Sequence, residues 1–424
     1  MSHLVDYRKD MSRDTRCSYC KWIPLAQIKS WRFAYGCPSV AKYLFHNYSA
    51  SGKIIMGLSL LDKRLDYSDK FVDIVYQCQM CGACDVACKI ISDREPLEIM
   101  RELRAQCVED GQILPAHLVT IEGLRKEDNM LGGLKADRGR WAEGLEVKDL
   151  TKESAEVAYH AGCRYSYDEE LQPIARATLA LLNKAGVDVG IMGKDETCCG
   201  GRAHEMGFQG EFTKYAESNI EAWTTAGVKT VITSCSDGFG AFKELYPRVG
   251  KEIKFEFLHI TEFLARLVTE GRIKLNKRVP MLVTYHDPCH LSRFTEPFIP
   301  MPGKEHKAFG QAFVHEAPKV SRSKGVFEAP RYILESIPGL KLVEMERIKE
   351  YTWCCGAGGG VWEAYPDFAL WTANERLEEA KATGAEALVT SCPWCERSFK
   401  DALAANGDKS FKVDNIVELI EQAI

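Results

Sequence analysis

The chain has 424 residues, with 55 lysines and arginines against 60 aspartates and glutamates, which gives a formal net charge of −5. Hydrophobic residues make up 46% and charged residues 27%, a balance that excludes a disordered chain and allows two or three domains with buried cores. The mildly acidic charge predicts no nucleic-acid partner, and no window holds the roughly 18 consecutive apolar residues of a membrane-spanning helix. Seventeen cysteines behind an N-terminus without a signal-peptide pattern favour metal or redox chemistry in the cytoplasm over a disulfide scaffold.

The cysteines lie in four groups, and only Cys107 stands outside them. The groups are Cys17, Cys20 and Cys37; Cys78, Cys81, Cys84 and Cys88; Cys163, Cys198, Cys199 and Cys235; and Cys289, Cys354, Cys355, Cys392 and Cys395. A charged, glycine-containing stretch without clear periodicity separates the first two groups from the last two. We therefore expect an N-terminal 4Fe–4S domain, a linker, and two related units, over residues 1–126, 127–152, 153–275 and 276–424.

The N-terminal domain is predicted from the motif Cys78-x2-Cys81-x2-Cys84-x3-Cys88. Three thiolates two residues apart can surround one iron–sulfur cube, while the fourth usually reaches a different cluster. Lys89 follows the last cysteine of this motif, whereas Pro38 follows Cys37. By the logic of two-cluster ferredoxins, Cys37 would join Cys78, Cys81 and Cys84 around one 4Fe–4S cube.

A second N-terminal metal site would then draw on Cys17, Cys20 and Cys88. Three thiolates can hold a 4Fe–4S cube with an open iron or with a non-cysteine ligand, and they can also hold a 3Fe–4S cluster. A zinc site built on Cys17 and Cys20 is the alternative. Cys107 would supply a missing ligand, but a lone cysteine is more often a small buried hydrophobe, so it stays unassigned.

Beyond the linker, the sequence predicts alternating strands and helices. Four of the expected strands are followed closely by a cysteine: Cys163, Cys235, Cys289 or Cys392. In the first unit we expect strands at 157–162, 187–192 and 229–233, and helices at 169–185, 211–225 and 240–246. In the second unit we expect strands at 281–285, 340–345 and 386–390, helices at 331–337 and 367–383, and a last helix opened by Cys392-Pro393-Trp394-Cys395.

The cysteine spacings match between the two units. In the first unit, 34 residues separate Cys163 from Cys198, and 35 separate Cys199 from Cys235. In the second unit, the corresponding gaps, from Cys289 to Cys354 and from Cys355 to Cys392, are 64 and 36 residues. The longer gap indicates an insertion, which we expect within 294–326. This repeat predicts a duplicated α/β architecture with mainly parallel strands, in which the cysteines lie at strand ends or helix starts along one edge of each sheet.

Adjacent cysteines followed by glycine are the most specific signal. Two neighbouring thiolates cannot both point at one corner of a compact cube without strain, so a Cys-Cys pair suits a cluster with a bridging thiolate. Gly200, Gly356 and Gly358 would let the backbone approach such a cluster and donate N–H groups to its sulfurs. The glycine run after Cys355 matches no dinucleotide-binding pattern.

The pattern Cys…Cys-Cys-Gly…Cys-x-x-Cys, present twice behind a ferredoxin-like motif, resembles the CCG-domain iron–sulfur proteins related to the B and D subunits of heterodisulfide reductase. Relatives in that group include the D subunit of class II benzoyl-CoA reductase complexes and the iron–sulfur subunits of glycolate and lactate oxidases. The resemblance implies an α+β chain overall, with a small helical ferredoxin-like N-terminal domain followed by a duplicated, Rossmann-like α/β CCG domain.

The resemblance also implies site residues. A complete five-cysteine motif carries a noncubane 4Fe–4S cluster in that family, and here Cys289, Cys354, Cys355, Cys392 and Cys395 match it. In the first unit, Gly238 stands where the fifth cysteine belongs, so that site would hold an ordinary cube, an altered cluster or nothing. His290 follows Cys289 and would protonate a leaving thiolate or tune a cluster, unless it only holds its loop.

We therefore expect an electron-transfer subunit of a heterodisulfide-reductase-like complex, which relays electrons through one or two cubane clusters to at least one noncubane site. The alternatives are a catalytic subunit that reduces a disulfide and a wiring-only subunit of the benzoyl-CoA reductase type. Because the chain has no flavin or nucleotide pattern, electrons must come and go through a flavoprotein, a ferredoxin-like protein or a membrane quinone-linked subunit in a hetero-oligomer. The expected location is the cytoplasm, and any association with the inner membrane would be peripheral, through partner subunits.

Overall fold

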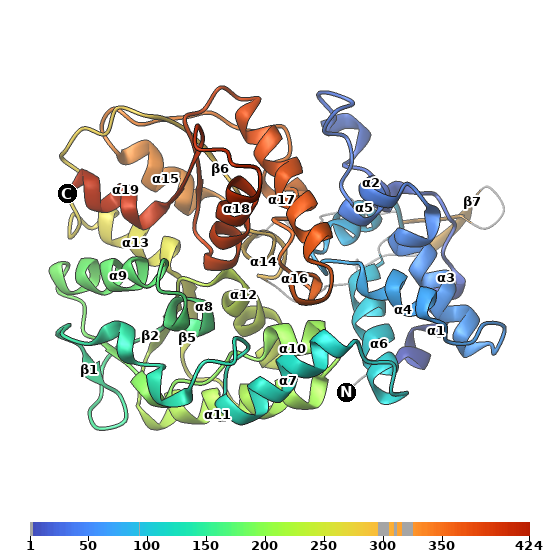
Figure 1. Ribbon diagram of the computed structural model, residues 1–424, viewed down its shortest axis with the longest axis horizontal. Helices are drawn as coiled ribbons and strands as arrows, with labels where there is room; N and C mark the ends of the chain where they lie inside the picture. Colours follow the sequence, from blue (N-terminus) through green and yellow to red (C-terminus); the bar gives the residue numbers. More distant parts are fainter. Residues whose placement is uncertain (1–2, 93, 296–304, 309–311, 316–324) are drawn as a thin grey trace.

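The computed structural model describes residues 3–92, 94–295, 305–308, 312–315 and 325–424. Its N-terminal part is helical and lies beside two sheet-containing units (Figure 1). Ser49 and Ser68 cap two of these helices, because their hydroxyl oxygens accept backbone N–H groups of the first turn. Three others begin with a proline, whose missing N–H has no partner at that position anyway. The helices are α1 (Arg8–Ser12), α2 (Pro38–Tyr43), α3 (Ala50–Leu61), α4 (Asp69–Tyr76), α5 (Ala83–Ser92), α6 (Pro96–Glu109) and α7 (Pro115–Glu127).

The first sheet has five strands in the order β1-β3-β2-β4-β5, and every neighbouring pair is parallel. The strands are β1 (Lys148–Asp149), β2 (Val157–His160), β3 (Val189–Ile191), β4 (Thr230–Thr233) and β5 (Glu256–His259). The helices of this unit are α8 (Gly162–Tyr167), α9 (Gln172–Lys184), α10 (Gly201–Glu205), α11 (Gln209–Thr225), α12 (Ser236–Gly240) and α13 (Ile260–Thr269). Because β1 pairs with β3, the end of the segment expected as a linker belongs to this sheet.

The second sheet has four parallel strands in the order β11-β10-β6-β9. They are β6 (Leu282–Tyr285), β9 (Lys341–Leu342), β10 (Ala387–Thr390) and β11 (Lys412–Asn415). The helices are α14 (Cys289–Arg293), α15 (Glu328–Ser336), α16 (Val361–Ala364), α17 (Pro366–Lys381), α18 (Pro393–Ala405) and α19 (Ile416–Ala423). If the edge strand β1 is left aside, the two sheets have the same strand order. In the first sheet β2 lies between β3 and β4, with β5 next to β4; in the second β6 lies between β9 and β10, with β11 next to β10.

One apolar core joins the two sheets. Helices α9 and α13 of the first unit pack against α19 and α15 of the second, as Figure 1 shows at its left side. The buried cluster between them includes Tyr159 and Leu258 from the first sheet and Val283 and Val389 from the second. All four are less than 5% exposed, so the two units share their interior rather than meeting through a polar surface.

The expected α/β architecture with parallel strands is confirmed, with differences in detail. The strand expected over 340–345 is shorter, and β5 and β11 form where no strand was predicted. The helix expected over 240–246 is the continuation of α12, which passes through a π-helical turn at Ala241–Leu245 into a 3-10 turn at Tyr246–Val249.

The expected insertion over 294–326 lies largely outside the described residues. Within it the structure describes an antiparallel pair, β7 (Glu305–Ala308) and β8 (Ala312–His315). In the described part of the chain, no helix is both long enough and apolar enough to cross a lipid bilayer.

Candidate functional site

The first cysteine cluster lies in the N-terminal part. Cys37, Cys78, Cys81 and Cys84 line one pocket of about 420 Å³, together with the ammonium-bearing side chain of Lys53. The loop between Cys78 and Cys84 can turn around this pocket because Met80 and Gly82 both adopt the left-handed backbone conformation, with φ of 53° and 73°. Burial raises the pKa of Cys37 to about 12, while the nearby Lys53 charge favours its thiolate. The four cysteines predicted around one cube thus meet in space.

The second N-terminal group lies where a 3-10 turn at Tyr19–Lys21 packs against α5. Cys20 in this turn is buried, Cys88 in α5 is half-buried, and Cys17 is exposed. Burial raises the pKa of Cys20, and the neighbouring Asp14 and Cys17 add to the effect. Cys107 lies elsewhere, fully buried in the apolar core of the N-terminal helices.

Five buried cysteines of the second unit meet at the edge where its parallel strands end. Cys289 follows β6 and starts α14, Cys392 follows β10 and precedes α18, and Cys354 and Cys355 occupy the loop before α16. Side-chain hydrogen bonds connect the thiols in series, from Cys289 through Cys354, Cys355 and Cys395 to Cys392. The backbone N–H of Gly356 also donates to Cys354 Sγ at 3.3 Å. We call these five residues the pentad.

The pentad touches the first cluster directly. Cys81 hydrogen-bonds to Cys354, and this bond lowers the pKa of the Cys81 thiol to about 6, with a further contribution from Arg293. The glycine-rich loop makes the approach possible, because a Cβ on Gly358 would lie 2.5 Å from the carbonyl oxygen of Gln79. A side chain at this position would therefore separate the two groups of cysteines.

Two buried arginines hold this junction together. Arg104 donates to five backbone carbonyl oxygens, those of Val75, Tyr76, Cys78, Glu205 and Gly359. Arg293 donates from Nη1 to the carbonyl of Cys81 at 2.8 Å and from Nε to that of Glu350 at 2.8 Å. The sequence suggested no such role for Arg104, and Arg293 only contributed to a basic bias whose default interpretation was a solvated loop; the structure instead buries both arginines.

A charged network surrounds His290 beside the pentad. Its Nε2 lies 2.6 Å from Glu205 Oε1, and its Nδ1 lies 3.2 Å from Asp237 Oδ1 and 3.4 Å from Cys289 Sγ. Burial disfavours the imidazolium, but the two carboxylates outweigh it and raise the pKa of His290 well above its usual value. Glu205 also accepts the Gly359 N–H at 2.9 Å, so His290 is linked to the glycine-rich loop. This arrangement places positive charge next to a thiolate.

The cysteines of the first unit are divided. Cys163, Cys198 and Cys199 lie together, and the N–H of Gly200 donates to Cys198 Sγ at 3.4 Å. Cys235 instead packs in the apolar cluster that contains Cys355, Cys392 and Cys395, and its thiol hydrogen-bonds to Cys392.

A buried ion pair closes one side of the three-cysteine group. Arg138 Nη1 lies 3.4 Å from Cys163 Sγ, and Arg138 Nη2 binds Glu196 Oε1 at 2.8 Å. Glu196 also accepts the backbone N–H groups of Ala161 and Gly162. The guanidinium therefore provides positive charge beside these thiols.

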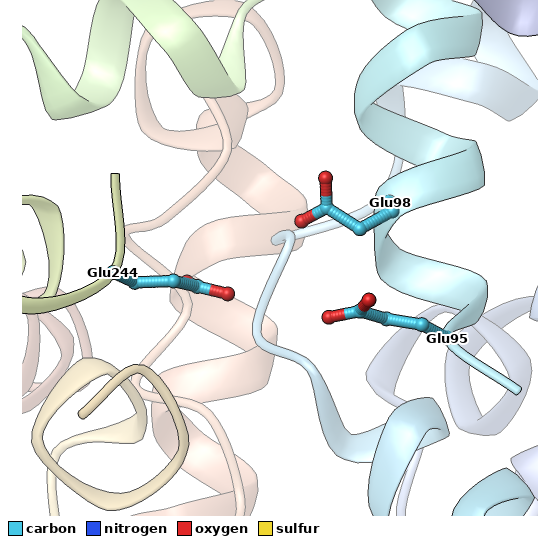
Figure 2. Close-up of side chains that lie close together, drawn as sticks. All are labelled: Glu95, Glu98 and Glu244. Carbon is cyan, nitrogen blue, oxygen red and sulfur yellow. The ribbon is translucent and has the colours of Figure 1, made fainter. Parts of the chain in front are cut away.

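Three glutamates also converge, outside the cysteine groups, and Figure 2 shows Glu95 and Glu98 facing Glu244. Their charge is already compensated by two arginines. Arg101 binds Glu98 and Glu244, and Arg248 binds the same two carboxylates at 2.8 and 3.2 Å. Burial opposes ionisation of Glu98, but the arginines hold its pKa below the usual value. This group is an ion-pair cluster and needs no metal ion.

The chain resembles known proteins along nearly its whole length. Residues 157–243 and 283–400 both match the family model of the cysteine-rich CCG domain. The chain is 32% identical over 440 residues to the D subunit of the dihydromethanophenazine:CoB–CoM heterodisulfide reductase of Methanosarcina mazei, an alignment that covers 97% of this chain and 93% of the relative. It is 28% identical over 386 residues to the EtfAB:quinone oxidoreductase of Syntrophomonas wolfei, of which it covers 48%.

A solved structure has a similar fold. The crystal structure of a hypothetical protein from Helicobacter pylori matches 88% of this chain, and 68% of its own, with a TM-score of 0.54 and 11% sequence identity. At this identity the likeness concerns the fold alone.

Proposed function

Because this chain belongs to the family of the heterodisulfide reductase D subunits, which is built on the cysteine-rich CCG domain, we propose that it is an iron–sulfur oxidoreductase subunit. It acts within a heterodisulfide-reductase-like complex, where it relays electrons from cubane 4Fe–4S clusters to a noncubane 4Fe–4S cluster. The observation that carries this proposal is the contact between Cys81 and Cys354, which lie with Cys289 in one buried cluster and bring together two cysteine groups, 273 positions apart in the sequence.

The residues fit the clusters in the chemistry of their donor atoms. Cys37, Cys78, Cys81 and Cys84 would hold a cubane cluster, since four thiols surround one pocket and Lys53 would offset part of the negative charge. Cys17, Cys20 and Cys88 would hold a second cluster, with a three-cysteine cube or a 3Fe–4S cluster as the options.

The pentad would hold the noncubane cluster. Its five thiols form a connected series, which is the arrangement that a cluster with a bridging thiolate requires. The N–H of Gly356 would donate to a ligand sulfur, as it does to Cys354 now, and the charge near His290 would stabilise additional electrons. When bound, these clusters supply one-electron transfer, and the protein supplies ligands, charge and the short separation between them.

We propose further that the two units arose by duplication and that the first has lost its complete site. Their matching strand order and the two matches to one family model support this view. Gly238 provides no thiol where the fifth cysteine belongs, and Cys235 lies against Cys392 of the other unit. The remaining cysteines, Cys163, Cys198 and Cys199, would hold an altered cluster at most.

A second candidate function is reduction of a disulfide at the pentad. His290 favours it, because its Nδ1 lies 3.4 Å from Cys289 Sγ and its protonated ring would donate to a thiolate that leaves a disulfide. Electron relay remains the main proposal, because Gly238 leaves the first unit without the fifth cysteine that a second complete site would need.

Anaerobic metal analysis with electron paramagnetic resonance tests the cluster assignment. We expect roughly 8 to 16 iron atoms per chain, from two to four clusters. Cys355→Ser should remove the noncubane signal and leave the cubane signals, whereas Cys199→Ser should have a smaller or different effect. One or more zinc ions per chain with little iron would overturn the proposal, and equal effects of the two substitutions would overturn the asymmetry between the units.

Native purification tests the complex. We expect the chain to co-purify with a flavin-containing or membrane-bound redox protein and to reduce low-molecular-weight disulfides poorly when isolated; one relative is named as a subunit of a heterodisulfide reductase, and another as a quinone oxidoreductase. A stable monomer that reduces such a disulfide with an artificial electron donor would instead favour the second candidate.

A further inference from the structure

One segment of the N-terminal domain has an unusual charge pattern. Residues 15–61 contain six lysines and arginines and not one aspartate or glutamate. Because the whole chain has a formal charge of −5 and this segment contributes +6, the rest of the chain carries −11. Lys53 is buried, but the other five cations of this run are exposed or partly exposed, so this region of an acidic protein has an excess of positive charge at its surface.

The same segment exposes large apolar side chains. Trp31 is 78% exposed, Leu44 72%, Phe45 63% and Leu25 62%, which makes them four of the five most exposed large hydrophobic residues in the described part of the chain. Exposed aromatic residues within a charged rim are typical of protein-binding surfaces. We call residues 15–46 with these four side chains the basic face.

Contacts within the structure hold the parts of this face together. The rings of Trp22 and Tyr35 stack at 4.2 Å and close the base of the loop that carries Leu25 and Trp31. Arg32 binds Glu375 of α17 at 2.5 Å, and Lys42 lies 5.0 Å from the centre of the Trp371 ring on the same helix. Figure 1 shows this blue loop projecting beside α17 and above α2. The loop and the end of α2 are therefore both fixed against α17.

A cysteine opens onto the same face. Cys17 is the one exposed cysteine among the seventeen. Burial lowers the pKa of the His46 imidazole, next to Phe45, and the charges of Lys21 and Arg16 lower it further against the opposing effect of Asp14. The exposed thiol thus lies among the cations of the basic face and leads inward through Cys20.

We propose that the basic face is the docking surface for an acidic one-electron carrier protein. The inference rests on the proposed function, because it assumes a cluster on Cys17, Cys20 and Cys88. In the docked pair one electron passes from the reduced carrier to this cluster, so the carrier is oxidised by one electron, the cluster is reduced by one, and no bond or proton is exchanged. Asp14 and Glu375 are the carboxylates that contact this face, and the cations outnumber them, so the face attracts an acidic partner and repels a basic one.

An anionic membrane surface would meet the same charges, but the structure favours a protein. Interfacial membrane binding typically uses an amphipathic helix with a continuous apolar face and a polar face rich in lysine and arginine. The basic face has only the six-residue helix α2 and 3-10 turns of three residues, and its outer cysteine is a feature that a lipid surface would not use.

Electron transfer from a small acidic ferredoxin with two 4Fe–4S clusters tests the proposal. The rate of cluster reduction in the anaerobically purified full chain is followed by stopped-flow absorbance over a range of salt concentrations. The triple variant R16Q/K29Q/K42Q should lower the second-order rate constant by about tenfold at low salt and weaken its salt dependence. Trp31→Ala should lower it at every salt concentration.

The control is K251Q/K274Q/K277Q, which removes three exposed lysines of the sheet-containing units and should change the rate constant less than about twofold. Reduction of every variant by titanium(III) citrate to the same extent as the parent chain shows that the clusters are intact, and a parent chain without iron would overturn the proposed function itself. An unchanged rate constant in the first triple variant would overturn the docking surface. So would loss of binding to phosphatidylglycerol vesicles in that variant without loss of electron transfer.

Discussion

Replacement of Arg104 by methionine tests whether the junction between the first cluster and the pentad depends on one side chain. Arg104 is fully buried and makes three short hydrogen bonds of 2.6 to 2.8 Å, to the carbonyls of Cys78, Glu205 and Gly359. Hydrogen bonds from a charged group contribute about 1.5 to 3 kcal/mol each. At the lower value these three contribute about 4.5 kcal/mol, part of which is offset because the variant no longer buries a cation. We expect a loss of about 3 kcal/mol in the free energy of unfolding.

Anaerobic urea denaturation followed by tryptophan fluorescence measures this loss, and a redox titration of the pentad signal measures the coupling. Arg104→Met should slow electron exchange between the cubane and noncubane signals, because the Gly359 backbone is no longer held to that of Cys78. Arg376→Met is the matched control, since Arg376 is equally buried but all its partners belong to the second unit: Glu379, the Arg347 carbonyl, His286 and Thr352. It should destabilise the chain without slowing the exchange. If Arg104→Met changes the unfolding free energy by less than about 0.5 kcal/mol, the reasoning fails.

Three further predictions concern single positions. Gly358→Ala should lower the melting temperature and weaken the coupling of the two signals, because its Cβ would collide with a carbonyl oxygen 2.5 Å away, whereas Gly210→Ala, with nothing within 4 Å, should leave both unchanged or slightly improved. Burial lowers the pKa of His117 from 6.5 to about 4, and Arg104 and Arg202 add to this against the Gly360 carbonyl and Glu363. Between about pH 6.5 and about pH 4, His117 is therefore protonated in the unfolded chain but neutral in the folded chain. The free energy of unfolding falls as the pH drops through this range, by about 3 kcal/mol in all. Urea denaturation at pH 7 and pH 4.5 should show a smaller drop for His117→Gln than for the parent chain, and an equal drop would contradict the assignment. Finally, Cys37→Ala should remove the signal of the same cluster that Cys81→Ala removes, whereas the buried Cys107→Ala should keep every cluster; a Cys37→Ala variant that changes only the Cys17 signal would show that the ligand grouping is wrong.

Sequence patterns predicted the strands that lead into cysteines, and the reason is physical. β2, β4, β6 and β10 are short, almost wholly buried apolar runs, which is the signature of parallel strands covered on both faces. β11 was missed because its sequence, Lys-Val-Asp-Asn, holds one apolar residue. It forms because it pairs along its full length with β10, a contact that no local pattern reveals.

The candidate site was predictable as a set of residues and only partly as an arrangement. The Cys-x2-Cys repeats and the Cys-Cys pairs identified which cysteines belong to the candidate site, because these spacings are visible within a short stretch of sequence. The hydrogen bond of Cys81 to Cys354 and that of Cys235 to Cys392 depend on how distant loops pack. Asp237 and Glu205 were missed for the same reason, since only the folded chain places them on either side of His290.

The wide separation of the pentad cysteines along the chain has a consequence for biosynthesis. Synthesis proceeds from the N-terminal side, so Cys37, Cys78, Cys81 and Cys84 and the residues that line their pocket are all available once synthesis has passed Met100. The pentad is complete only when Cys395 and α18 have appeared, more than 300 residues after Cys84. If the proposed clusters are present, iron–sulfur assembly factors would therefore be able to fill the N-terminal cysteine group early and the pentad only much later in synthesis. Until then Cys81 is without its Cys354 neighbour, so a stalled or truncated chain would present an N-terminal cluster with an open side to oxygen.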